Sequence, residues 1–140
     1  MPGPDELVGV LRRRGLRATP QRRAIIEAVR TAGGHVTAES VFDRVRRDLP
    51  TISLKTVYET LHSLVAAEEM RELATGVGPI RFDTTARPHH HLICLKCNRI
   101  EDIDLDIDAK ALDPRQGFSV VRTEVIVWGC CCDCQDRGPN

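Results

Sequence analysis

The chain has 140 residues, with 20 basic and 20 acidic side chains and a formal net charge of zero, which allows one or two small domains. No apolar stretch approaches the roughly 20 residues of a membrane-spanning helix, and the N-terminus lacks the apolar core of a signal peptide. We therefore expect a cytoplasmic protein whose six cysteines stay reduced and favour metal binding over disulfides.

The first 70 residues have helical periodicity. The pattern predicts helices over 5–14, from Pro20 to about residue 31, from 37 to before Pro50, and from Ser53 onward. Positions 70–74 and 80–83 then flank a Gly-containing turn, as in a β-hairpin. This order predicts a winged helix-turn-helix whose recognition helix starts at Ser53. A generic helical bundle with an attached hairpin is the alternative.

Strands predominate after a short polar linker at 84–88. We predict strands over 92–94, 98–103 and 118–127, with only a short helix over 107–112 before Pro114. The expected fold class is α+β. A winged-helix DNA-binding domain (1–83) and a hinge (84–88) precede a small α/β dimerisation and metal-binding domain (89–140).

Charge is spread unevenly. Residues 1–30 hold seven arginines against three acidic residues, and residues 101–113 hold six acidic residues against one lysine. A basic start suits a polyanion such as DNA, and an acidic stretch suits hard cations. Two solvated faces would give the same pattern.

Two Cys-x-x-Cys pairs predict a structural zinc site. Each pair places two sulfurs on one tight turn, and four thiolates satisfy tetrahedral Zn2+. The predicted ligands are Cys94, Cys97, Cys131 and Cys134. Cys130 and Cys132 lack this spacing; they are either filler or redox-active thiols beside the cluster.

Three consecutive histidines precede the first pair. On a strand, His89 and His91 share one face and His90 points the other way. His35 lies in the expected turn between helices of the first domain. With His35, Asp83 and Asp102 the two histidines form a mixed nitrogen and oxygen set that suits Fe2+ or Mn2+, with Zn2+ or Ni2+ as in-vitro substitutes. A histidine run on the surface is the alternative. Ligands from both domains would let the metal fix the angle between them, and so the spacing of two recognition helices in a dimer.

Together these motifs resemble the ferric uptake regulator superfamily of metal-dependent repressors. The resemblance covers nearly the whole chain, in RATPQR (17–22), SLKTVYETL (53–61), RFD (81–83), HHHLICLKC (89–97) and WGCCCDC (128–134). It implies a cytoplasmic homodimer, not an enzyme, that binds a palindromic operator in double-stranded DNA. It assigns Cys94, Cys97, Cys131 and Cys134 to structural zinc, and His35, Asp83, His89, His91 and Asp102 to the regulatory metal. It also implies that Tyr58 contacts DNA, with Lys55 and Thr56 as neighbours and Arg17 and Arg22 at phosphates.

The two aspartates, Asp83 and Asp102, stand where iron-sensing members of the family usually carry glutamate. They resemble the peroxide-sensing branch, in which a ligand histidine, here His35 or His89, is oxidised and the operator is released. Hydrogen peroxide would be the only small-molecule signal. A one-residue shift would instead make Glu101 the ligand. The alternative function is a repressor responsive to iron, manganese or zinc without peroxide chemistry.

The chain departs from the family in two places. Pro88, and Thr123 or Glu124, stand where some members carry histidines of a further metal site, so we expect that site to be absent. The helix between the second and third strands of the second domain is shortened by Pro114. A metalloenzyme is disfavoured because no substrate pocket or general base is indicated. A zinc-stabilised interaction module without DNA binding is disfavoured by the basic N-terminus and the recognition helix.

Overall fold

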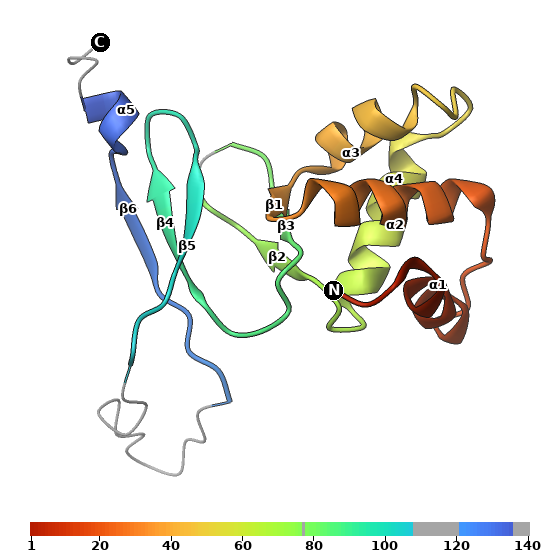
Figure 1. Ribbon diagram of the computed structural model, residues 1–140, viewed down its shortest axis with the longest axis horizontal. Helices are drawn as coiled ribbons and strands as arrows, with labels where there is room; N and C mark the ends of the chain where they lie inside the picture. Colours follow the sequence, from red (N-terminus) through yellow and green to blue (C-terminus); the bar gives the residue numbers. More distant parts are fainter. Residues whose placement is uncertain (77, 108–120, 136–140) are drawn as a thin grey trace. The chain divides into compact units, whose positions relative to one another are not determined.

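The computed structural model describes residues 1–76, 78–107 and 121–135, and it divides into two compact units, Met1–Ala86 and Arg87–Asn140 (Figure 1). The division falls inside the predicted hinge. The short helix predicted over 107–112 and the first part of the strand predicted over 118–127 fall mostly outside the described residues. None of the helices in the described ranges has the length and apolarity needed to cross a lipid bilayer.

Four helices build the first unit: α1 (Pro4–Arg13), α2 (Pro20–Ala32), α3 (Ala38–Val45) and α4 (Leu54–Val65). Three of these helices have side-chain caps: Thr19, Thr37 and Ser53 each accept a hydrogen bond from the backbone N–H three residues later. Helix α3 ends at Val45, earlier than Pro50 suggested. One core joins all four helices, and Ile25, Val57 and Leu61 are fully buried in it.

A three-stranded antiparallel sheet completes this unit, with the order β1 (His35–Val36), β3 (Arg81–Asp83), β2 (Arg71–Leu73). The hairpin of β2 and β3 is the predicted wing, shorter at both strands than expected. His35 was expected in a turn between helices; instead it begins β1 and pairs with β3. The backbone N–H of Thr84 extends this pairing by donating to the carbonyl of Gly34 at 3.0 Å.

Phe82 anchors the sheet to the last helix. Its side chain is fully buried, and its ring lies 6.3 Å from the ring of Tyr58 and 5.5 Å from that of His62, both on α4. The strand that carries Asp83 is therefore packed directly against the predicted recognition helix.

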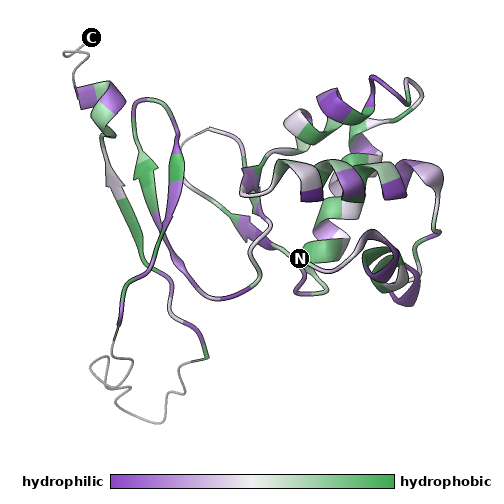
Figure 2. Ribbon diagram, viewed as in Figure 1, coloured by the Kyte–Doolittle hydropathy of each residue, from purple (hydrophilic) through white to green (hydrophobic). Residues whose placement is uncertain are grey.

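The second unit is a sheet with the order β5 (Ile100–Ile103), β4 (His90–Cys94), β6 (Ile126–Gly129), followed by the short helix α5 (Cys132–Gln135). Strands β4 and β5 are antiparallel, whereas β4 and β6 are parallel. Strand β6 runs to Gly129, two residues past the predicted end. Residues 121–125 form no ladder pairs with β4, so the strand begins at Ile126. Apolar residues run along β4 and β6 (Figure 2), and Leu92, Val127 and Trp128 remain exposed.

Candidate functional site

The four cysteines of the two Cys-x-x-Cys pairs meet at one end of the second unit. Because β4 and β6 are parallel, their carboxyl ends lie at the same edge, and each is followed by a cysteine turn. The four sulfurs lie within 4.8 Å of one another, and those of Cys97 and Cys131 are 3.7 Å apart. Tetrahedral zinc with bonds of about 2.3 Å requires sulfurs about 3.8 Å apart. The cluster therefore fits structural zinc.

The first cysteine turn is shaped by its backbone. Asn98 adopts a left-handed φ of 57°, a conformation that asparagine tolerates better than most residues. Its N–H donates to the carbonyl of Cys94 at 2.9 Å. The second turn is joined to the first by Arg99, which pairs with Asp133 at 3.0 Å and with Glu101 at 2.7 Å.

Three of the four cysteines have shifted pKa values, and the shifts differ in direction. Backbone N–H groups, first that of Cys131, at 3.4 Å, and then those of Cys97 and Lys96, lower the pKa of Cys94 to about 5. Hydrogen bonding to the neighbouring sulfurs, first that of Cys131, raises the pKa of Cys134 to about 12. Burial is the main cause that raises the pKa of Cys131. One thiolate is thus preformed, and further protons must leave when zinc binds.

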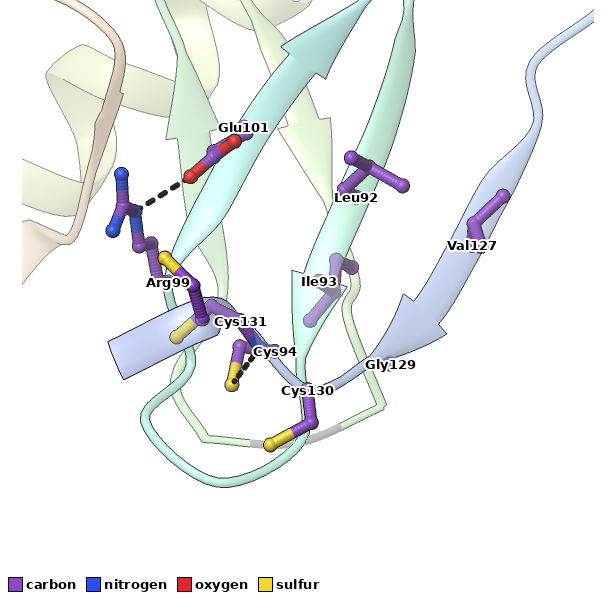
Figure 3. Close-up of a pocket in the computed structure, with 10 residues that line it drawn as sticks. Leu92, Ile93, Cys94, Arg99, Glu101, Val127, Gly129, Cys130 and Cys131 are labelled. Atoms are coloured by element: carbon purple, nitrogen blue, oxygen red, sulfur yellow. Dashed lines mark hydrogen bonds and ion pairs between the residues drawn. The ribbon is translucent and has the colours of Figure 1, made fainter. Parts of the chain in front are cut away.

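The two remaining cysteines flank Cys131. Cys130 is partly buried and Cys132 is exposed. Both line a cavity of about 200 Å³ on the sheet, together with Leu92 and Val127 (Figure 3). The structure thus assigns neither thiol to the zinc cluster.

Each unit holds part of the predicted nitrogen and oxygen set. In the first unit, His35 and Asp83 are directly opposed cross-strand partners. Asp83 is fully buried, and its Oδ1 accepts a hydrogen bond from the N–H of Thr85 at 2.8 Å. This bond restrains the orientation of the carboxylate.

In the second unit, His89 and His91 converge on Asp102. Asp102 Oδ1 lies 3.5 Å from His89 Nε2 and 4.0 Å from His91 Nε2. The pairing of β4 with β5 sets His91 opposite Asp102 and Leu92 opposite Glu101. Glu101 therefore lies on the other face, beside Arg99 (Figure 3). This register puts Asp102, and not Glu101, on the sheet face of His91.

All three histidines are buried, with exposed fractions of 5%, 8% and 1% for His89, His90 and His91. The alternative of a surface run is thereby wrong. His90 has a structural contact instead: its Nδ1 accepts a hydrogen bond from the backbone N–H of Val125 at 3.0 Å. It ties β4 to the segment that enters β6.

Glu124 is a residue that the sequence pattern did not assign. Its carboxylate lies 3.4 Å from His91 Nδ1 and 2.7 Å from Arg122. Only the parallel pairing of β4 with β6, which is not visible in a local pattern, places it beside His91.

Two of the predicted DNA contacts, Arg17 and Lys55, are exposed on the first unit. Arg17 is exposed in the turn before α2, and the Lys55 side chain is 85% exposed at the start of α4. The hydroxyl of Thr56 lies 2.9 Å from that of Ser53, and Tyr58 donates to Glu39 on α3 at 2.8 Å. This bond is the main cause that raises the pKa of Tyr58.

Arg22 is mostly buried, with a side-chain exposure of 13%. It donates to the carbonyl of Arg17 at 2.9 Å and lies 3.5 Å from Glu59 on α4. In the free protein it joins the turn before α2 to the recognition helix.

Comparison with known proteins adds to this geometry. Residues 13–127 match the ferric uptake regulator family. The chain is 32% identical, over 95% of its length and 92% of the relative, to the peroxide-responsive repressor PerR of Staphylococcus saprophyticus.

Solved structures share the fold. The Helicobacter pylori ferric uptake regulator superposes with a TM-score of 0.71 at 20% identity, covering 96% of this chain and 95% of that one. The Campylobacter jejuni peroxide stress regulator gives 0.66 at 27% identity, covering 90% and 96%.

Proposed function

The chain belongs to the ferric uptake regulator family, a family of metal-dependent transcriptional regulators rather than enzymes, and from that premise we propose that it senses hydrogen peroxide through its regulatory metal. Operator DNA is held while the metal is bound, and peroxide releases it. Such a repressor works in the cytoplasm, at the chromosome. The observation that supports the metal role most directly is the convergence of His89 and His91 on Asp102.

The regulatory ion takes its ligands from both units in this proposal. His35 and Asp83 contribute from the wing sheet, and His89, His91 and Asp102 from the second sheet. Imidazoles with carboxylates suit Fe2+ or Mn2+, whereas the thiolate cluster suits Zn2+. An ion shared by the two units restrains their relative orientation and thereby links metal binding to DNA binding.

DNA binding is assigned to the first unit of a dimer. Proteins of this family bind operator DNA as dimers. We assign phosphate contacts to Arg17 and Arg22 and groove contacts to Lys55, Thr56 and Tyr58. Arg22 reaches a phosphate only after leaving Glu59. Leu92 and Val127 pair across the strands and expose apolar side chains on one sheet face, which serves as the dimer contact. The operator is then palindromic, with half-sites about 34–36 Å apart or a multiple of that distance.

Peroxide sensing rests on the pair of aspartates and on the similarity to peroxide-responsive relatives. A bound Fe2+ supplies the redox chemistry that activates hydrogen peroxide. In the net reaction, the C2–H of His35 or His89 becomes a C2 carbonyl, one oxygen atom is gained from peroxide, and the other leaves as water. The oxidised imidazole binds metal poorly, so the restraint on the two units is lost.

The test compares wild type with Asp102→Glu, both loaded with Fe2+ and bound to operator DNA. We expect peroxide to release the wild type and to add one oxygen to the peptide that holds His35 or His89, as read by mass spectrometry. The Glu variant should bind DNA in a metal-dependent way but resist peroxide. Equal release of both proteins, or oxidation confined to Cys130 and Cys132, would refute histidine-based sensing. Release by metal removal alone would favour a repressor that responds to iron, manganese or zinc.

A further inference from the structure

We infer that Glu124 is a positioning residue of the regulatory metal site, fixing the tautomer and ring orientation of His91 so that Nε2 is presented to the metal. This inference rests on the proposed function, because it concerns the same ion. It assigns a role to a residue that neither the motif spacing nor the family resemblance identified.

His91 lies between two carboxylates that approach opposite ring nitrogens. Glu124 Oε1 is 3.4 Å from Nδ1, and Asp102 Oδ1 is 4.0 Å from Nε2. The ring is 1% exposed, so bulk water does not compete for either nitrogen. Each ring nitrogen thus has its own carboxylate neighbour: Nδ1 faces Glu124, and Nε2 faces Asp102.

His89 shows the same division of roles. Its Nδ1 is 2.9 Å from the carbonyl oxygen of Arg87, and its Nε2 is 3.5 Å from the same Asp102 oxygen. A carbonyl can only accept a hydrogen bond, so Nδ1 carries the proton and Nε2 has the lone pair. At His91 both neighbouring carboxylates can only accept, and Glu124 at 3.4 Å is closer to its ring nitrogen than Asp102 at 4.0 Å; we therefore assign the N–H to Nδ1 and leave Nε2 to share a cation with Asp102. Both Nε2 lone pairs are then directed to the side of Asp102.

Histidines that bind metals commonly donate their other ring N–H to a carboxylate or a carbonyl, which fixes the ring and raises the basicity of the ligand nitrogen. Arg87 and Glu124 supply one partner of each kind. The negative charge of Glu124 also compensates part of the charge of a divalent ion through the imidazole. A neutral amide at this position would keep the shape but lose the charge.

Glu124 is itself held in place. Its side chain is 20% exposed and pairs with Arg122 at 2.7 Å. The next residue, Val125, is bound to β4 twice: its N–H donates to His90 Nδ1 and its carbonyl accepts from the N–H of His91, both at 3.0 Å. A carboxylate fixed by its neighbours is suited to orient a ligand, because little freedom is lost when metal binds.

The experiment measures Mn2+ affinity of the zinc-loaded protein by electron paramagnetic resonance, without DNA. Glu124→Gln should weaken binding about 10- to 100-fold while zinc content and the melting temperature of the manganese-free protein stay unchanged. Glu101→Gln is the matched control, since Glu101 lies on the other face beside Arg99. It should bind Mn2+ as the wild type does.

Cobalt spectra separate positioning from direct ligation. With saturating Co2+, the visible bands of Glu124→Gln should keep their positions, because the ligand atoms are unchanged; shifted bands would refute the positioning role. Unchanged Mn2+ affinity in Glu124→Gln would also overturn the inference. If that variant does not fold, Arg122→Gln, which removes the ion pair that holds the Glu124 carboxylate, should lower Mn2+ affinity by a smaller factor. Unchanged Mn2+ affinity in Arg122→Gln would refute the inference. A wild type that binds no Mn2+ or Fe2+ would refute the proposed function itself, and the inference with it.

Discussion

Replacing Phe82 by leucine tests the packing of the wing strand on the recognition helix. The ring is fully buried and contacts Tyr58 and His62. Deleting such a side chain to alanine costs about 3–5 kcal/mol, but leucine retains most of the volume and should cost about 1–1.5 kcal/mol. For a unit of 86 residues, that loss lowers the melting temperature by about 4–12 °C.

Two optical probes distinguish the units in this assay. Far-ultraviolet circular dichroism follows α1 to α4, most of the helix in the described ranges. The single tryptophan of the chain, Trp128, lies in β6 and follows the second unit. Phe82→Leu should lower the helical transition and leave the tryptophan transition in place. The control is Phe42→Leu, since Phe42 is only partly buried. An equal loss in both variants, or an equal shift of both probes, would refute the reasoning.

Three further outcomes are expected. Because the pKa values of Cys131 and Cys134 are raised, both thiols keep their protons at neutral pH and must lose them to zinc; zinc binding should release at least two protons, and affinity should rise about 100-fold per pH unit. A pH indicator in weak buffer measures this release, and fewer than two protons per zinc would contradict it. Glu39→Gln should lower the pKa of Tyr58, the only tyrosine, toward its ordinary value; an ultraviolet titration with an unchanged midpoint would show that the carboxylate is not the cause. Ser53→Ala removes the cap of α4 and should cost about 0.5–2 kcal/mol in denaturant unfolding, whereas an unchanged midpoint would mean that the cap contributes nothing.

The fold class was predictable because its signals are local. Caps at Thr19, Thr37 and Ser53 begin helices where expected, and β2 and β3 form on the two sides of the predicted turn. The α+β prediction and the winged first unit are confirmed, as is the meeting of the four Cys-x-x-Cys thiols. The spacing of the cysteines was enough to predict this cluster, because each Cys-x-x-Cys pair forms its own turn.

The strand ends and the partners of the histidines were less predictable, because they depend on pairing between distant segments. Strand β1 has only two residues, too few to show an alternating pattern, so His35 was expected in a turn. The choice between Glu101 and Asp102 depended on the register of β4 and β5. Glu124 became visible only through the parallel pairing of β4 and β6. The ligand assignment of the regulatory ion stays a prediction.

The position of the cysteines along the chain has a consequence for biosynthesis. All six lie at or after residue 94, whereas the first unit ends at Ala86. Domains generally fold in the order in which the ribosome produces them. The helical unit contains no cysteine and can therefore complete its core first, without any thiolate ligand. The sheet unit must wait for Cys134, and during that interval its thiolates are exposed to other metals and oxidants. We therefore expect zinc supply during translation to affect the yield of the sheet unit and not that of the helical unit.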